Sequence, residues 1–195
     1  MTEPVKNRLI DIAPDAMTSA DHDLHQRLTQ GRGRIPQPFR VWQHCPKIAD
    51  GMEVIGTHLD NASVFSPPEA EIIILSVAAY WRSPYVVTNH VRHSRTAGLS
   101  EEAIETICAG GKPHFDDARH QLLADVVWAA LEKRDLGDAT FATFEKAFGR
   151  RGIAELLAAI GYFTAVSIAM RFHAMRPTSK SVITPPVKAG LETRK

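Results

Sequence analysis

Apolar residues recur every three or four positions through most of the chain, with polar residues between them. Two stripes with this spacing are Ile48, Met52, Ile55 and Leu59, and Phe115, Ala118, Leu122, Val126 and Ala130. The period is typical of amphipathic α-helices and differs from the strict alternation of a half-buried strand. It therefore predicts helices across the middle of the chain.

Capping signals separate these stripes into individual helices. Ser66 is followed by two prolines and Glu69, a pattern that begins a helix with a capping box. The run Ile-Ile-Ile-Leu at 72–75 fits a buried strand equally well by itself, but the capping box and the alanines that follow favour a buried helix. A further helix is expected to end at Gly98, and Ser100 is a suitable N-cap for the next one.

The most apolar segment, residues 153–170, predicts a long helix that is apolar over much of its surface. A shorter helix is expected before it, beginning at Asp138 and ending near Gly149. Because a helix that is apolar nearly all round needs cover on every side, partner subunits are expected to supply part of it. We predict an all-α bundle of roughly six to eight helices that forms a homo-oligomer, a trimer or a hexamer.

The two ends of the chain differ from this central part. Residues 1–34 are polar and are predicted to be an N-terminal arm with a short helix around 19–29. Residues 177–195 begin with proline and contain Pro185-Pro186, which favours an extended C-terminal tail. The helical domain is therefore expected to cover residues 35–176.

Composition and charge limit the classes of partner that we expect. Apolar residues make up 44% of the chain, and the formal net charge is +1, so no strong field favours nucleic acid or an anionic membrane. The first residues lack the basic start and long apolar run of a secretory signal, and the apolar segments look too short or too interrupted to span a bilayer. We expect a cytoplasmic protein that takes a small-molecule substrate, with neither nucleic acid nor membrane as partner.

The segment from Glu71 to His93 holds the most informative candidate chemistry. Glu71 shares one helix face with Leu75, so its carboxylate is expected to be shielded from water. On the next helix, one face carries Val86, His90, His93 and Ala97, and an adjacent face carries Tyr85, Asn89 and Arg92. If the two helices pack antiparallel, Glu71 and His90 converge. Such a carboxylate–imidazole pair can donate and accept protons near neutral pH.

The same residues also fit structural roles and a metal site. Glu71 can be a first-turn acid that favours the helix dipole, and His90 a hydrogen-bonded core histidine beside a packing Tyr85. Two histidines three positions apart, together with Glu71, can also form a two-histidine, one-carboxylate metal set. Pairs of histidines with this spacing are common by chance, and we predict neither a metal nor another cofactor.

The order and spacing of these residues resemble the sequence pattern of the carboxymuconolactone decarboxylase and alkylhydroperoxidase (AhpD-like) family. Members carry a run close to E-L-V-I-L-x-V-A-x-x-x-x-C-x-Y-x-W-x-x-H, followed by A-G-L-S. This chain has Glu71, the apolar run 72–77, Tyr85, His90 and Ala-Gly-Leu-Ser at 97–100 in register. Segments 38–46 and 161–164 are also similar to the family. The resemblance covers residues 35–176 and implies an AhpD-like helical bundle.

Departures from the family pattern change the implied chemistry. AhpD-like peroxidases carry a C-x-x-C pair between the glutamate and the histidine, and register places those positions at Ser83 and Val86. Without two thiols there, peroxide reduction through a disulfide is expected to be absent. Val87 replaces a common tryptophan, and Asn89 stands where the decarboxylase branch often has histidine.

The thiol-free branch implies a cofactor-independent acid–base lyase, a decarboxylase. Its substrate would be a small carboxylated lactone or a related intermediate of aromatic-compound catabolism. The implied catalytic residues are Glu71, His90 and Tyr85, and the implied substrate-binding residues are Asn89, Arg40, Ser83, Val86 and His93. Arg40 is the first candidate for the cation that holds the carboxylate, and Arg82 is the second.

Two other functions fit the sequence. One is an AhpD-like peroxidase of peroxiredoxin type that uses Cys45 or Cys108, although neither occupies a motif position. The other is a non-catalytic, oligomeric small-molecule binder, which would keep its ligand affinity when Glu71 or His90 is replaced.

Overall fold

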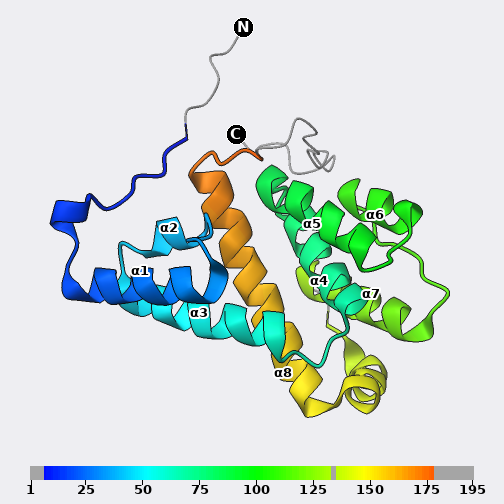
Figure 1. Cartoon of the computed structure of the whole chain (residues 1–195). Helices are drawn as coiled ribbons and strands as arrows, with labels where there is room; N and C mark the ends of the chain where they lie inside the picture. The colour runs from blue at the N-terminus through cyan, green and yellow to red at the C-terminus, as the bar shows by residue number, and fades with distance from the viewer. Residues whose placement is uncertain (1–6, 133–134, 178–195) are drawn as a thin grey trace, which may run out of the picture.

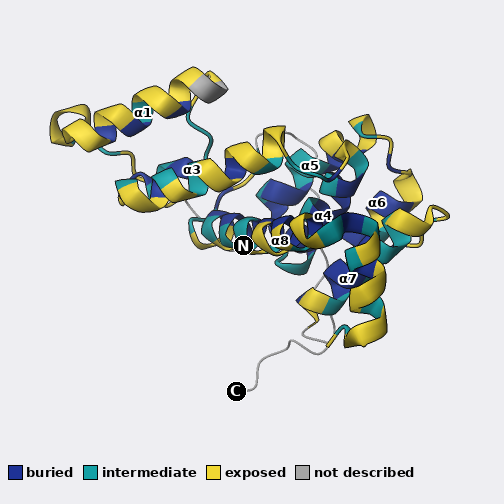
Figure 2. Ribbon diagram, turned by 90° about the horizontal axis from the view of Figure 1, so that it is seen from below, coloured by how far each residue is buried: buried dark blue, intermediate teal, exposed yellow. Residues whose placement is uncertain are grey.

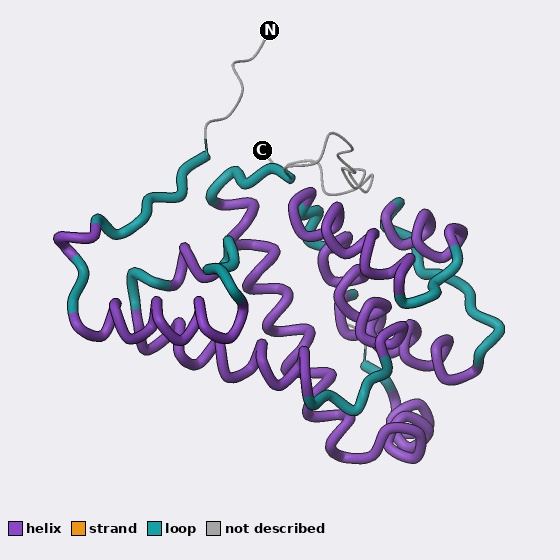
Figure 3. Tube along the Cα trace, in the orientation of Figure 1, coloured by secondary structure: helices purple, strands orange, loops and turns teal. Residues whose placement is uncertain are grey.

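The computed structural model describes residues 7–132 and 135–177, and these residues form helices and loops without strands (Figure 3). In chain order the helices are the short 3-10 helix η1 (Pro14–Ala16), α1 (Ser19–Arg32), α2 (Phe39–Trp42), α3 (Pro46–Asn61), α4 (Pro67–Tyr80), α5 (Pro84–Thr96), α6 (Glu101–Cys108), α7 (Ala118–Leu131) and α8 (Gly137–Phe172). The prediction of an all-α bundle is confirmed. The run 72–75 lies within α4 and is helical.

Helix α4 lies at the centre of the bundle and packs against α5, α6, α7 and α8. Its side chains Ile72, Leu75 and Val77 are completely buried and contribute to the main apolar core. Helices α1–α3 lie on one side of the C-terminal half of α8, and α4–α7 lie on the other (Figure 1). Because other helices cover α4 on all sides, its apolar residues are not restricted to one face of the helix.

A smaller apolar cluster joins the N-terminal helices. Leu24 and Leu28 of α1 pack with Phe39 and Ala49, and all four side chains are buried. Most of the remaining surface of α1 and α3 is exposed (Figure 2). The predicted short helix at 19–29 is therefore present, extends to Arg32 and is anchored on α3. Residues 178–195, nearly all of the predicted C-terminal tail, lie outside the described residues.

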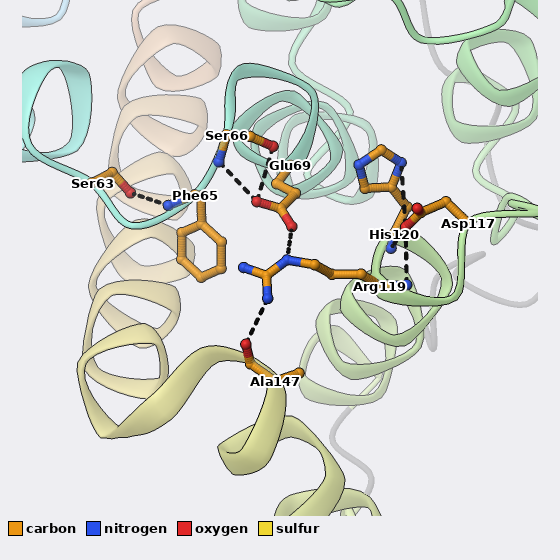
Figure 4. Close-up of polar contacts among 8 residues, drawn as sticks. All are labelled: Ser63, Phe65, Ser66, Glu69, Asp117, Arg119, His120 and Ala147. Atoms are coloured by element: carbon orange, nitrogen blue, oxygen red, sulfur yellow. Dashed lines mark hydrogen bonds and ion pairs between the residues drawn. The ribbon is translucent and has the colours of Figure 1, made fainter.

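The start of α4 is fixed by the predicted capping box and by an arginine from α7. Glu69 accepts hydrogen bonds from the backbone amide and the hydroxyl of Ser66, at 2.8 and 2.9 Å. Its other oxygen accepts from Arg119, which also donates to the carbonyl of Ala147 (Figure 4). The guanidinium of Arg119 lies 3.8 Å over the ring of Phe148. Since Glu69 is buried, this pairing offsets the cost of desolvating its charge and ties α4, α7 and α8 together.

Helix α8 contains a kink that separates two predicted helices. Gly149 has φ 70° and ψ 177°, a conformation that only glycine adopts readily, and the helix changes direction there. The predicted helix from Asp138 to Gly149 and the predicted long helix 153–170 are the two parts of this element.

By length and composition alone, α8 is apolar enough to cross a membrane, a test that the core helix of a soluble protein also passes. Our expectation that this segment is too short rested on residues 153–170 only, and α8 is longer. In the structure α8 packs against α3, α4, α5 and α7. This packing buries part of its apolar residues within the bundle, among them Leu156 and Phe163.

Candidate active site

Glu71 and His90 meet where α4 packs against α5. Residues 81–83 join the two helices, so the beginning of α4 lies beside the second half of α5. The Nδ1 atom of His90 lies 3.0 Å from one carboxylate oxygen of Glu71 and 3.2 Å from the other. The predicted convergence of the two side chains is therefore present, and both are mostly shielded from water.

The surroundings of the pair fix the orientation of the imidazole. Ser94, which is fully buried, donates its hydroxyl to Glu71 at 3.2 Å. An ionised carboxylate only accepts hydrogen bonds, so beside ionised Glu71 the neutral ring of His90 has its proton on Nδ1 and its basic nitrogen at Nε2. Within the described residues Nε2 has no hydrogen-bond partner. The ring also packs edge-on against Phe163, with centroids 5.7 Å apart.

Two cavities meet at this histidine. The first, which we call the apolar cavity, has a volume of about 760 Å³ and is lined by Glu71 and largely by apolar side chains of α3, α4 and α8. The second, the basic cavity, has a volume of about 470 Å³. The residues common to both linings are Asp60, His90, His93 and Phe163. The imidazole of His90 is thus accessible from a wall that the two cavities share.

Most of the predicted site residues line one of these cavities. Glu71 lines the apolar cavity, and Tyr85, Val86, Asn89, His90 and His93 line the basic cavity. Burial raises the pKa of the Tyr85 hydroxyl, and a side-chain hydrogen bond with Asn89 partly opposes this effect. Tyr85 is therefore protonated near neutral pH and can donate a hydrogen bond. The structure brings the tyrosine and the amide together as one polar group on the cavity wall.

Burial also lowers the pKa of His93, and the neighbouring His90 adds to the effect. Their rings are 5.4 Å apart between centroids. Because one positive charge disfavours another nearby, His93 is expected to stay neutral when His90 takes up a proton. No group of three or more His, Cys, Asp or Glu side chains in residues 7–132 and 135–177 is arranged to hold a metal ion.

Two predicted binding residues do not reach either cavity. The guanidinium of Arg40 forms two hydrogen bonds with Asp11, each 2.6 Å long, and one with Gln37. The charge of Arg40 thus anchors the N-terminal segment to α2, and Arg40 lines neither cavity. Ser83 precedes α5 with a side chain that is completely buried outside both cavity linings. Arg82, the second cation candidate, is absent from both linings as well.

Three other arginines, none of them predicted as the anion-binding cation, supply positive charge at the basic cavity. Arg34, Arg92 and Arg176 line the basic cavity from the loop after α1, from α5 and from the segment after α8. None of the three forms an ion pair with a described residue. The sequence places Arg92 on the same helix face as Tyr85 and Asn89, but Arg92 was not among the predicted cations. Arg34 and Arg176 are brought to the cavity only by the fold.

Neither cysteine lies at the site. Cys108 is buried on α6, where desolvation raises the pKa of its thiol to about 11. Cys45 is exposed immediately before α3. Neither residue lines the apolar or the basic cavity. At neutral pH the Cys108 thiol is therefore protonated and is a poor nucleophile.

The fold has counterparts among solved structures. An uncharacterised peroxidase-related protein from Silicibacter sp. TM1040 superposes with a TM-score of 0.69 at 16% sequence identity, over 92% of this chain and 96% of that one. A peroxidase-related protein from Ralstonia eutropha JMP134, described as an alkylhydroperoxidase AhpD core, gives a TM-score of 0.69 at 15% identity, over 89% and 93% of the two chains. No protein-family model and no curated protein sequence matches the chain.

The chain therefore has the AhpD-like helical fold over almost its whole length. This finding agrees with the resemblance seen in the sequence around Glu71 and His90. At such low identity it defines the architecture, and the chemistry has to be argued from the site.

Proposed function

We propose that this protein is an acid–base enzyme that acts on a small organic acid without a redox thiol pair. The observation that carries the proposal is the contact between His90 Nδ1 and Glu71, which leaves the basic Nε2 at the wall shared by two cavities. A carboxylate that orients a histidine and stabilises its protonated form is a recurring device for proton transfer. The nearby arginines supply a place for an anionic group.

The chemistry that suits this arrangement is proton transfer to or from carbon next to a carbonyl or carboxylate group. In a decarboxylation, the bond between the carboxylate and its neighbouring carbon breaks and CO₂ leaves. The electron pair stays behind as an enolate, whose oxygen Tyr85 and Asn89 can stabilise by donating hydrogen bonds. His90 first takes up a proton from water on Nε2, and Glu71 stabilises the resulting imidazolium. The imidazolium then gives this proton to the carbon and returns to its neutral form. In this reaction Arg92 holds an anionic group of the substrate that does not react.

A cofactor-independent lyase acting on a carboxylated lactone from aromatic-compound catabolism is the specific reaction we favour. Support comes from the sequence resemblance, from the valine and serine at the two thiol positions, and from the basic cavity beside Tyr85. The direct test is turnover of a panel of lactone acids and β-keto acids, followed by release of CO₂. We expect Glu71→Gln and His90→Asn each to lower kcat at least 100-fold, because general acid–base catalysis contributes about 10²–10⁴-fold.

A matched control is available on α3. His58 also contacts a glutamate, Glu155, at 3.0 Å, but it lines neither the apolar nor the basic cavity. His58→Asn should therefore leave kcat within about twofold of the parent. Equal losses in His58→Asn and His90→Asn would mean that the effect is structural, and unchanged turnover in Glu71→Gln would contradict the proposal.

Peroxide reduction is the second candidate, because both structural counterparts are described as peroxidase-related. Such an activity would have to use Cys45 or Cys108. Peroxide turnover with a dithiol reductant, measured for the parent, Cys45→Ala and Cys108→Ala, separates the two functions. Turnover by the parent that disappears in either variant would favour the peroxidase and would overturn the thiol-free mechanism.

A further inference from the structure

The two cavities differ sharply in charge. The described residues that line the apolar cavity include two carboxylates, Glu71 and Asp60, and no arginine or lysine. The basic cavity shares Asp60 but adds three guanidiniums, those of Arg34, Arg92 and Arg176. Because the positive charge is concentrated in the basic cavity, a negatively charged group is more favourably placed there than in the apolar cavity. This difference sets the direction in which an asymmetric ligand can lie.

The apolar cavity is also larger than a small carboxylated ring requires. Its volume of about 760 Å³ lies within the range of about 300–1,000 Å³ that is typical of pockets for drug-sized ligands. Side chains from α3, α4 and α8 give it hydrophobic walls, among them Leu59, Ile73, Ile74 and Ala159. Such walls gain free energy by contact with apolar surface of a ligand. Space of this size beside the reacting histidine points to a substrate with a substantial apolar part.

We infer that the substrate is an amphipathic carboxylic acid, of aryl-alkanoic or medium-chain type, that extends through both cavities. Its carboxylate lies among Arg34, Arg92 and Arg176, its apolar body lies against Ile74 and Ala159, and the carbon between them faces His90. This inference rests on the proposed function, because it assigns the substrate class of the same site. For the carboxylated lactone favoured above, it adds the requirement of an apolar substituent that makes contacts well beyond the reacting atoms.

Binding of unreactive acids tests this inference without any turnover. In ligand-observed NMR titrations of the whole protein with butanoate, hexanoate and octanoate, we expect the dissociation constant to fall by about two- to fourfold for each added methylene group. Octan-1-ol, which has the same chain length as octanoate but no charge, should bind at least tenfold more weakly than octanoate.

Paired variants separate the two halves of the ligand. Arg92→Gln should weaken octanoate at least fivefold, whereas Arg95→Gln, on the same helix but paired with Glu101, should leave it unchanged. Ala70→Phe partly fills the apolar cavity, so it should abolish the gain from butanoate to octanoate while butanoate itself still binds.

Three results would overturn the inference: equal affinity for butanoate and octanoate, equal affinity for octan-1-ol and octanoate, or identical titrations of Arg92→Gln and Arg95→Gln. Because these are binding measurements, they do not depend on the proposed chemistry. If the expected binding pattern appears but no acid is turned over, the proposed function fails and the assigned ligand class stands. If acids are turned over but chain length has no effect on binding, the proposed function stands and the assigned ligand class fails.

Discussion

At the scale of single residues, the two glutamate–histidine pairs of this chain illustrate different uses of the same chemistry. Glu155 accepts four hydrogen bonds, from the Val64 amide at 2.7 Å and from Ser63, His58 and Arg151 at 2.7–3.0 Å. Burial alone would raise the pKa of this carboxyl, but the hydrogen bonds outweigh burial and lower it to about 2. All four hydrogen bonds of this carboxylate are structural, and they join α8 to α3 and to the segment before α4.

The Glu155 network predicts how stability depends on pH. Because the pKa of Glu155 in the folded protein lies below its ordinary value of 4.5, its contribution is complete above pH 4.5 and is lost as pH falls toward 2. Glu155→Gln should lower the free energy of unfolding at pH 7 by about 2 kcal/mol, because a charged acceptor is lost. It should also flatten the fall in stability between pH 4.5 and 3. Urea unfolding at a series of pH values measures both effects, and an unchanged acid dependence would contradict the assignment.

Glu71, in contrast, has His90 and Ser94 as its hydrogen-bond partners in the described part of the chain. The meeting of Glu71 and His90 could be predicted from the sequence, because helical spacing and the family resemblance place both on facing helices. Of the arginines at the basic cavity, only Arg92 could be predicted, because it shares a helix face with Asn89. Arg40 lies in a motif-like segment but pairs with Asp11, whereas Arg34 and Arg176 reach the basic cavity from regions with no motif.

At the scale of elements, the kink in α8 depends on one glycine. Gly149 adopts φ 70° and ψ 177°, and a Cβ atom added there would meet nothing within 4 Å. The cost of Gly149→Ala is therefore conformational, and we expect a loss of about 1–3 kcal/mol in the free energy of unfolding. Gly161 lies in the regular part of the same helix with equally open space, so Gly161→Ala should be neutral or stabilise by up to about 1 kcal/mol.

Chemical unfolding of both glycine variants checks this difference. Similar effects of Gly149→Ala and Gly161→Ala would show that the kink does not need glycine.

Helix boundaries that carry a local capping signal could be predicted from the sequence. The capping box of Ser66 and Glu69 gave the start of α4, and Ser100 gave the start of α6, where its hydroxyl accepts from the Ala103 amide. The sequence could not predict that two helices join into α8. A glycine next to a helix indicates the end of the helix and a kink within it equally well.

At the scale of the whole molecule, the exposed side of α8 bears on assembly. Leu157, Ile168 and Phe172 are 62%, 41% and 73% exposed although all three are large and apolar. Large apolar groups gathered on one element are typical of contact surfaces. We therefore keep the expectation of a homo-oligomer as a proposal, with this side of α8 as the contact between copies.

Replacing the apolar groups tests the proposed assembly. Leu157→Glu together with Ile168→Lys should convert the oligomer to a smaller species, measured by size-exclusion chromatography with light scattering. Ile10→Lys, which changes an equally exposed apolar residue outside the helices, is the control and should leave the mass unchanged. A monomeric parent protein would contradict the proposal, as would a double variant of unaltered mass.

The shape of the two cavities is a property of the whole molecule. Their walls come from α3, α4, α5, α8 and the segments after α1 and α8, so their shape follows from how the helices pack. Periodicity in the sequence predicts each helix but not the angle at which helices cross, and for this reason Asp60 at the end of α3 was not anticipated at the site.

The central claim is that Glu71 holds His90 with its proton on Nδ1 and leaves Nε2 free to take and give a proton at the shared wall. The ¹⁵N chemical shifts of the imidazole nitrogens, assigned to His90 by comparison with His90→Asn, report this directly. In the parent protein at a pH where the ring is neutral, we predict a protonated Nδ1 and an unprotonated Nε2, and a mixture of the two forms in Glu71→Gln. A proton on Nε2 in the parent, or identical spectra of the parent and Glu71→Gln, would contradict the account.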